Sequence, residues 1–177
     1  DAVKKGMAYI TESRRDNGFF PNFSIAQNIA ISRSLKDGGY KGAMGLFHEV
    51  DEQRTAEAQR ELLALKCHSV NQNITELSGG NQQKVLISKW LCCHPEVIIF
   101  DEPTRGIDVG AKAEIYKVMR QLADDGKVIL MVSSELPEII TVCDRIAVFC
   151  EGRLTQILTN RDDMSEEEIM AWALPHE

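Results

Sequence analysis

The pattern of apolar and polar positions predicts several strands separated by helices. Residues 97–100 and 128–132 are uninterrupted apolar runs, and residues 7–11 form a third. Short runs without alternation are typical of strands that are buried on both faces, as in parallel sheets. Because a helical pattern follows each of the first two runs, we expect an α/β fold with a mostly parallel sheet.

Helical patterns fill much of the remaining chain. Ser24 and Gln27 have the spacing of a capping box, which predicts that a helix begins at Ser24. Leu86, Trp90 and Cys93 recur at helical spacing and predict a helix with one buried stripe, which Pro95 ends. The helices expected on these grounds span residues 24–31, 48–67, 78–93, 109–124 and 165–174.

The connecting segments complete this picture. Four glycines between residues 36 and 45 predict a mobile surface loop, and the two helices on either side of it make residues 24–75 a mostly helical insert. The aromatic residues of segment 19–23 are expected to form a satellite core contact. Residues 146–150 and 153–157 predict an antiparallel hairpin, and Ser134 is expected to cap a helix that has Pro137 in its first turn.

Two adjacent carboxylates lie at the end of the predicted strand 97–100. Asp101 and Glu102 precede Pro103, which stops the strand. Open α/β sheets place ligands at the carboxyl ends of their strands. Asp101 can hold a hydrated Mg²⁺ while Glu102 polarises an attacking water. The alternative is a buried strand that ends in an acidic turn. Glu12 follows residues 7–11 and is either a site residue or a solvated loop charge.

The start of the predicted helix 78–93 has the composition of a phosphate site. Ser78, Gly79, Gly80 and Asn81 occupy its first turn. The N–H groups of a first helical turn are unpaired, the macrodipole is positive there, and glycines let a phosphate approach the backbone. An ordinary Ser-capped helix with a flexible entry remains the alternative.

Composition narrows the possible functions. The 177 residues fit one domain with a sizeable core. Asp and Glu number 27 against 20 Lys and Arg, so the net charge is −7 and argues against a nucleic-acid-binding surface. We find neither an apolar run of membrane-spanning length nor a signal peptide, so any membrane role is expected to be peripheral. Five cysteines without CxxC spacing fit a reducing compartment, and Cys92 and Cys93 are expected to be buried thiols.

Taken together, these motifs resemble the ATPase domain of ABC transporters. Residues 77–80 match the signature, residues 101–103 match the Walker B segment, and Asp108 matches the D-loop. The resemblance implies a P-loop NTPase-like fold with a helical subdomain insert at about 24–75, and it implies ATP and Mg²⁺ as cofactors. Residues 77–84, 101–108 and 132–138 look like the C-terminal half of the two-domain ATPase subunits of monosaccharide importers, which serve ribose, galactose, xylose, arabinose and allose.

Departures from the family pattern qualify this resemblance. No Gly-x-x-x-x-Gly-Lys-Ser/Thr occurs, so residues 1–177 are expected to be a single partial domain that begins after the phosphate loop. Glu12 stands where the family usually has the Q-loop Gln, and Asn81 replaces the usual signature Gln. Ser134 stands where most members have the switch His. We therefore expect hydrolysis at this half's own Walker B to be weak.

The resemblance also implies partners. ABC-type ATPase halves pair head to tail, so Ser78, Gly79 and Gly80 would complete a site whose phosphate loop lies on the other ATPase half. A transmembrane permease is the expected partner of the segment from Glu12 through the insert, with a periplasmic sugar-binding protein acting indirectly. The implied location is peripheral, at the cytoplasmic face of the inner membrane. The alternative function is a non-catalytic interaction half used for dimerisation and permease docking.

Overall fold

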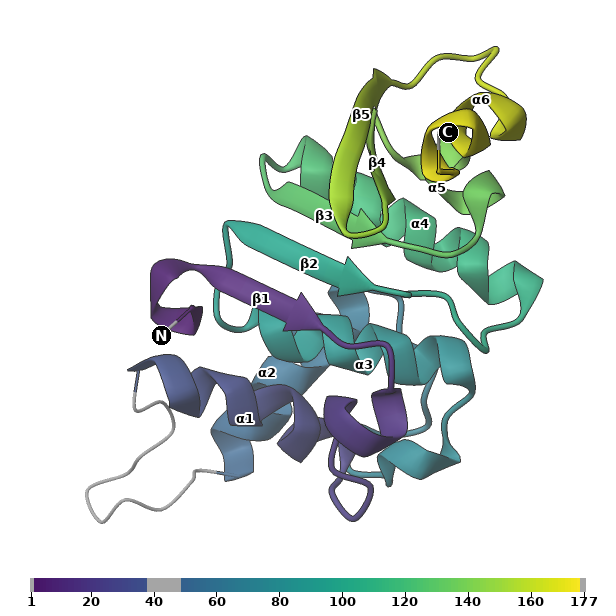
Figure 1. The fold of residues 1–177 in the computed structure, drawn as a ribbon. Coiled ribbons are helices and arrows are strands. Elements are labelled where there is room, and N and C mark those ends of the chain that lie inside the picture. The colour runs from purple at the N-terminus through teal and green to yellow at the C-terminus, as the bar shows by residue number, and fades with distance from the viewer. Residues whose placement is uncertain (1, 38–48, 176–177) are drawn as a thin grey trace. The chain divides into compact units, whose positions relative to one another are not determined.

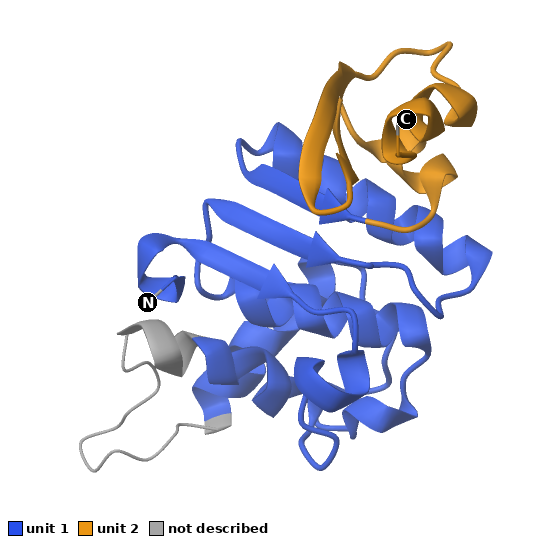
Figure 2. Ribbon diagram, in the orientation of Figure 1, with its two compact units in different colours: residues 1–132 blue, residues 133–177 orange. Residues whose placement is uncertain are grey.

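The computed structural model describes residues 2–37 and 49–175, so most of the glycine-rich loop expected at 36–45 lies outside the described residues. The chain divides into two compact units, Asp1–Val132 and Ser133–Glu177 (Figure 2). Within the described residues, the strands of unit 1 are β1 (Met7–Ile10), β2 (Val97–Asp101) and β3 (Val128–Val132). Its α-helices are α1 (Ile25–Asp37), α2 (Glu49–Leu62), α3 (Gly79–Leu91) and α4 (Val109–Asp124). Short helical turns are η1 (Val3–Lys5), η2 (Arg14–Gly18) and η3 (Ile74–Glu76).

The strands of unit 1 form a parallel sheet with β2 at its centre. Their order is β1-β2-β3, and both neighbours run parallel to β2 (Figure 1). The register places Tyr9 beside Ile99 and Ile99 beside Leu130. The expected parallel α/β sheet is therefore confirmed, and its central strand is the one that carries the acidic pair at its carboxyl end.

One face of this sheet is buried and the other is not. Ile98 and Phe100 are fully buried, and α1, α2 and α3 gather on one side of the sheet (Figure 1). On the opposite face, 48% of Tyr9 and 54% of Leu130 are exposed. The prediction that these strands are buried on both faces is thus wrong for the described residues, because the helices of unit 1 cover a single face.

Helix α3 is buried around its whole circumference. Residues 82–89 are all buried, so the prediction of one buried stripe is wrong. Two of the buried polar side chains on α3 donate hydrogen bonds to neighbouring carbonyls, which lowers the cost of their burial. Lys89 Nζ donates to Gly18 O at 2.5 Å, and Gln82 Nε2 donates to Leu77 O at 3.1 Å. Cys92 and Cys93 are buried, as expected.

Helix boundaries follow local backbone chemistry. The capping box is confirmed, because Ser24 N donates to Gln27 Oε1 and Gln27 N donates to Ser24 Oγ. Helix α1 runs to Asp37 rather than ending at residue 31. Helix α2 ends at Leu62 rather than residue 67, because Ala64 has a left-handed backbone with φ 47° that breaks the helix. Of the aromatic segment 19–23, only Phe19 joins the core.

Unit 2 contains α5 (Leu136–Val142), β4 (Arg145–Cys150), β5 (Arg153–Thr159) and α6 (Glu166–Ala173). Strands β4 and β5 pair antiparallel, which confirms the hairpin. The expected capping role of Ser134 is wrong, since Glu135 is the N-cap residue of α5. The hydroxyl of Ser133 instead accepts from Glu135 N at 3.0 Å and donates to Glu138 Oε2 at 3.1 Å. A serine hydroxyl commonly bonds to the backbone N–H two residues further along, and Ser133 is the serine at that distance from Glu135.

Candidate functional site

Asp101 ends the central strand and is held by a tyrosine from the neighbouring strand. Tyr9 lies on the same face of the sheet, and its hydroxyl donates to Asp101 Oδ2 at 2.5 Å. This hydrogen bond raises the pKa of Tyr9, since ionisation would place a second negative charge beside the carboxylate. The contact therefore orients the carboxylate that the sequence assigns to Mg²⁺. Sequence reasoning treated Tyr9 only as a strand residue.

Glu102 has a left-handed backbone immediately after the strand. Its φ is 46°, its N–H donates to Val132 O at 2.9 Å, and its carbonyl accepts from Arg105 N at 3.2 Å. A non-glycine residue in this region carries strain, and Ala64, His94 and Glu151 have the same backbone elsewhere in the chain. The chain thus turns sharply at Glu102. Asp101 has the extended backbone of β2 and Glu102 has a left-handed one, so the two neighbouring side chains do not follow the alternation of a strand.

Glu12 reaches the turn that follows Glu102. Its carboxylate forms an ion pair with the guanidinium of Arg105. Both side chains are exposed, so the pair contributes little to stability, but it brings the loop after β1 to the loop after β2. Direct contact of Glu12 with Mg²⁺ or water stays a prediction. Arg105 was missed in the sequence, although its place two residues after Pro103 put it near the acidic pair.

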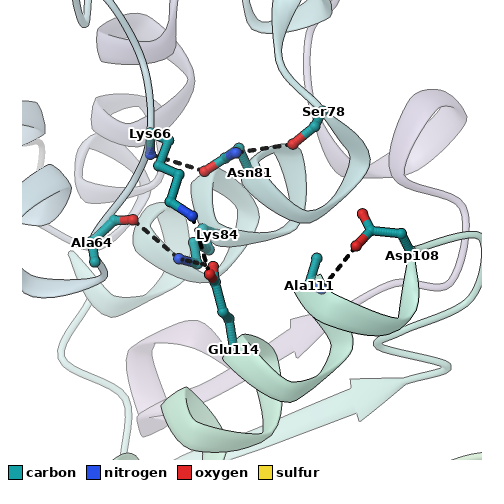
Figure 3. A network of polar contacts seen from close by, with 8 residues as sticks. All are labelled: Ala64, Lys66, Ser78, Asn81, Lys84, Asp108, Ala111 and Glu114. Carbon is teal, nitrogen blue, oxygen red and sulfur yellow. Dashed lines mark hydrogen bonds and ion pairs between the residues drawn. The ribbon is translucent and has the colours of Figure 1, made fainter.

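The hydroxyl of Ser78 does not act as an ordinary helix cap. Ser78 is the exposed N-cap residue of α3, yet within the described residues its side chain accepts from no N–H of the first turn. It accepts instead from Asn81 Nδ2 at 2.9 Å, while Asn81 Oδ1 accepts from Lys66 N at 2.9 Å (Figure 3). Asn81 thus orients the Ser78 hydroxyl, and this hydroxyl does not cap the first-turn N–H groups of α3. A phosphate site at a helix start uses such N–H groups.

The signature glycines lie against two other parts of the site. A Cβ on Gly80 would lie 2.6 Å from the Cβ of Ala111 in α4, so only glycine fits this approach. A Cβ on Gly79 would lie 3.5 Å from Arg14 Nη2. Gly80 thus has a packing role in addition to the phosphate role that the sequence suggests.

Arg14 connects the loop after β1 with the signature and the D-loop. Its Nη2 donates to Gly106 O at 3.3 Å and is near Gly79. Burial lowers the pKa of this guanidinium, and neighbouring Arg15 adds to the effect. Arg14 was missed in the sequence because its neighbours come from distant segments. It places a positive charge beside the start of α3, where an anion is expected to bind.

Asp108 and Ser134 lie in different units. Asp108 is the N-cap of α4, and its Oδ1 accepts from Ala111 N at 2.9 Å. Its location on α4 brings it to the junction where Gly80 meets Ala111. Ser134 is exposed in unit 2, between β3 and α5. The acidic pair, Glu12, the signature start and Asp108 all belong to unit 1, whereas Ser134 belongs to unit 2 and its switch role stays a prediction.

A family model described as ABC transporter matches residues 1–105. The chain belongs to the ABC transporter family. Solved structures agree on the fold: an ATP-binding cassette in a dimeric post-hydrolysis state bound to ADP and Pi has a TM-score of 0.71 at 22% identity, covering 89% of this chain and 64% of its own. A second ATP-binding cassette of an ABC transporter has a TM-score of 0.72 at 22% identity, covering 95% and 64%.

Curated relatives are ATP-binding proteins named for sugar transport. The chain is 98% identical to the D-allose import ATP-binding protein of Escherichia coli (strain K12), covering 100% of this chain and 35% of that protein. It is 47% identical to the L-arabinose transport ATP-binding protein of Geobacillus stearothermophilus, covering 96% and 32%. It is 46% identical to a ribose import ATP-binding protein of Bacillus cereus, covering 98% and 34%. The chain thus spans about a third of the length of these relatives.

Proposed function

We propose that this chain is part of an ATP-hydrolysing subunit of a monosaccharide importer, with D-allose as the favoured sugar because of the relative that is 98% identical. In this proposal the chain supplies its signature to an ATP site whose phosphate loop lies on another ATPase half. The observation that carries the proposal is the start of α3, where Asn81 turns the exposed Ser78 hydroxyl away from capping and glycines follow. The family membership supports the head-to-tail pairing that this arrangement needs.

The start of α3 has the chemistry to bind the terminal phosphate of ATP. The N–H groups of Gly79 and Gly80 belong to the first turn of a 13-residue helix, whose dipole favours an anion there. The Ser78 hydroxyl can donate to a phosphate oxygen while it accepts from Asn81. Arg14 adds a positive charge close to Gly79. A phosphate at the start of α3 would therefore have hydrogen-bond donors and a positive charge beside it.

The acidic pair fits Mg²⁺ and a hydrolytic water. Carboxylate oxygens are the ligands that Mg²⁺ prefers, and it is commonly held by one or two carboxylates together with substrate phosphates and waters. Asp101, whose carboxylate Tyr9 orients, would hold the hydrated ion. Bound Mg²⁺ would neutralise charge on the phosphates, and Glu102 would polarise the attacking water. Ser134 cannot provide the imidazolium contact of a switch His, so we expect slow turnover at this pair.

A permease is the proposed membrane partner, and two aromatic rings support a docking surface for it. Phe20 and Phe23 stack with centroids 5.1 Å apart and are both exposed. Buried Asn28 holds this loop, since its Nδ2 donates to Phe20 O at 3.1 Å. No helix in the described ranges has the length and apolar character needed to traverse a bilayer. We propose a peripheral position at the cytoplasmic face of the inner membrane, with a periplasmic sugar-binding protein acting through the permease.

A non-catalytic interaction half is the second candidate function. Ser134 in the switch position favours it, because a hydroxyl cannot provide the imidazolium contact of a switch His. In that case the chain supports dimerisation and permease docking, and Glu102 contributes nothing to turnover. The two candidates agree on the partners and differ on whether the acidic pair is used.

The test uses the full-length subunit assembled with its permease in proteoliposomes. We expect Ser78→Arg to lower ATP hydrolysis and sugar uptake by about 100-fold, because the bulky cation fills the phosphate position. Ser69→Arg adds the same charge to an exposed loop and serves as the matched control. Wild-type uptake by Ser78→Arg would refute the proposal. Glu102→Gln separates the candidates: lower turnover supports hydrolysis at this pair, and unchanged turnover supports the interaction half.

A further inference from the structure

The carboxylate of Glu114 accepts hydrogen bonds from two lysines that belong to separate segments. Lys84 Nζ, from α3, donates to Glu114 Oε2 at 2.8 Å, and Lys66 Nζ, from the loop after α2, donates to Oε1 at 3.2 Å (Figure 3). These hydrogen bonds, with that of Lys84 the stronger, lower the pKa of the Glu114 carboxyl. We call Lys66, Lys84 and Glu114 the lysine clamp. It joins α4 to both α3 and the segment that precedes the signature.

The pair between Lys84 and Glu114 dominates the clamp. Only 4% of the Lys84 side chain is exposed, against 74% for Lys66. A buried ammonium needs a counter-charge, whereas an exposed pair is screened by water. Lys84 Nζ also donates to Ala64 O at 3.1 Å, at the residue whose left-handed backbone ends α2. Lys84 therefore fixes the turn that leads into Lys66.

The clamp reaches Ser78 through the backbone of Lys66. The Asn81 amide has one accepting end, Oδ1, and one donating end, Nδ2. Because the Lys66 N–H is a donor, it pairs with Oδ1, and Nδ2 then faces Ser78 Oγ. A shift of the segment 64–66 would rotate this amide and move the hydroxyl. The orientation of Ser78 thus depends on a segment that Glu114 and Lys84 hold.

The same clamp sets the signature against the D-loop. Asp108 caps α4, and Glu114 lies less than two turns further along that helix. Gly80 lies against Ala111 between these two points, so α3 and α4 approach each other closely there. We propose that Glu114 is a positioning residue, which through Lys84 and Lys66 holds Ser78 and Asp108 in one rigid arrangement for the nucleotide. This inference rests on the proposed role of Ser78.

The test is a double-mutant cycle in the full-length subunit with its permease, with kcat and KM for ATP measured separately. We expect Glu114→Gln to lower kcat about fivefold and to change KM by less than about twofold. In a Ser78→Ala background, the same substitution should lower kcat by less than about twofold, because the hydroxyl that Glu114 is proposed to position is absent. Glu61→Gln, on an exposed position of α2, is the matched control and should leave kcat unchanged.

A second variant keeps the test decisive if Glu114→Gln fails to fold. Lys84→Met combined with Glu114→Leu replaces the pair, in which Lys84 is buried and Glu114 is partly exposed, by apolar side chains of similar size, which proteins often tolerate. We expect this variant to keep its melting temperature and still lose kcat. A folded variant with wild-type kcat would overturn the proposal, as would equal losses from Glu114→Gln with and without Ser78. Unchanged kcat in Ser78→Ala alone would overturn the proposed function as well.

Discussion

At the scale of single residues, the site depends on contacts between residues that are far apart in the chain. The hydroxyl of Tyr9 meets the carboxylate of Asp101 across 92 positions, and Arg14 meets Gly106 across the same separation. Local motifs drew attention to Asp101, but a tyrosine or an arginine in a loop carries no comparable signal. Side chains of this kind are recognised only when the sheet brings their strands together.

The role of Tyr9 can be tested by removing its hydroxyl. Tyr9→Phe keeps the ring and deletes the donor to Asp101. Partners that orient a metal-binding side chain commonly affect metal affinity, so we expect the Mg²⁺ concentration for half-maximal ATP hydrolysis by the full-length subunit to rise about threefold to tenfold. Tyr116→Phe, in α4, is the control and should not change it. An unchanged Mg²⁺ dependence in Tyr9→Phe would contradict the orienting role.

At the scale of elements, α3 shows how a polar sequence can form the centre of a unit. Its pattern predicted one apolar stripe, yet α1, α4, β1 and η2 all contact it. Lys84 can be buried because Ala64 O and the Glu114 carboxylate accept from its ammonium group, and Lys89 because Gly18 O accepts from its own. Amphipathic periodicity assumes that polar side chains face water, and this assumption fails where backbone carbonyls are nearby.

The junction of α3 and α4 gives a prediction at this scale. Gly80→Ala would place its Cβ against Ala111, so we expect the free energy of unfolding of the chain to fall by about 1–3 kcal/mol. Adding Ala111→Gly reopens the space and should restore all but about 1 kcal/mol, the helix cost of the new glycine. Urea denaturation measures both. If the double variant is less stable than Gly80→Ala alone, the close approach is not the cause.

Beyond single elements, the sheet of unit 1 presents an apolar face that the described helices of unit 1 do not cover. Met7, Tyr9, Val128, Leu130 and Val132 make up this open sheet face. The uninterrupted apolar runs predict strands buried on both sides, and the parallel sheet forms as predicted. Apolar composition therefore indicates the strands correctly, but within the described part of unit 1 it overestimates how many of their faces are covered.

Dye binding tests the open sheet face. We expect the chain to bind 8-anilinonaphthalene-1-sulfonate in its folded state, because the dye reports exposed apolar surface. Leu130→Lys should reduce the dye fluorescence while changing the free energy of unfolding by less than about 1 kcal/mol, since 54% of Leu130 is exposed. Ile98→Lys puts the same charge on the fully buried face and should prevent folding. Equal fluorescence of Leu130→Lys and the parent chain would contradict this assignment.

Features that depend on neighbouring residues could be predicted from the amino-acid sequence alone. It predicted the parallel strands, the capping box at Ser24, the hairpin of unit 2 and the family, because periodicity, caps and motifs are local patterns. Features that depend on distant residues became visible in the folded structure. Those are the burial of α3, the open sheet face, the tyrosine on Asp101 and the lysine clamp on Glu114. The physical reason is that burial and pairing are set by which elements meet, and residues separated by tens of positions leave no local pattern of their contact.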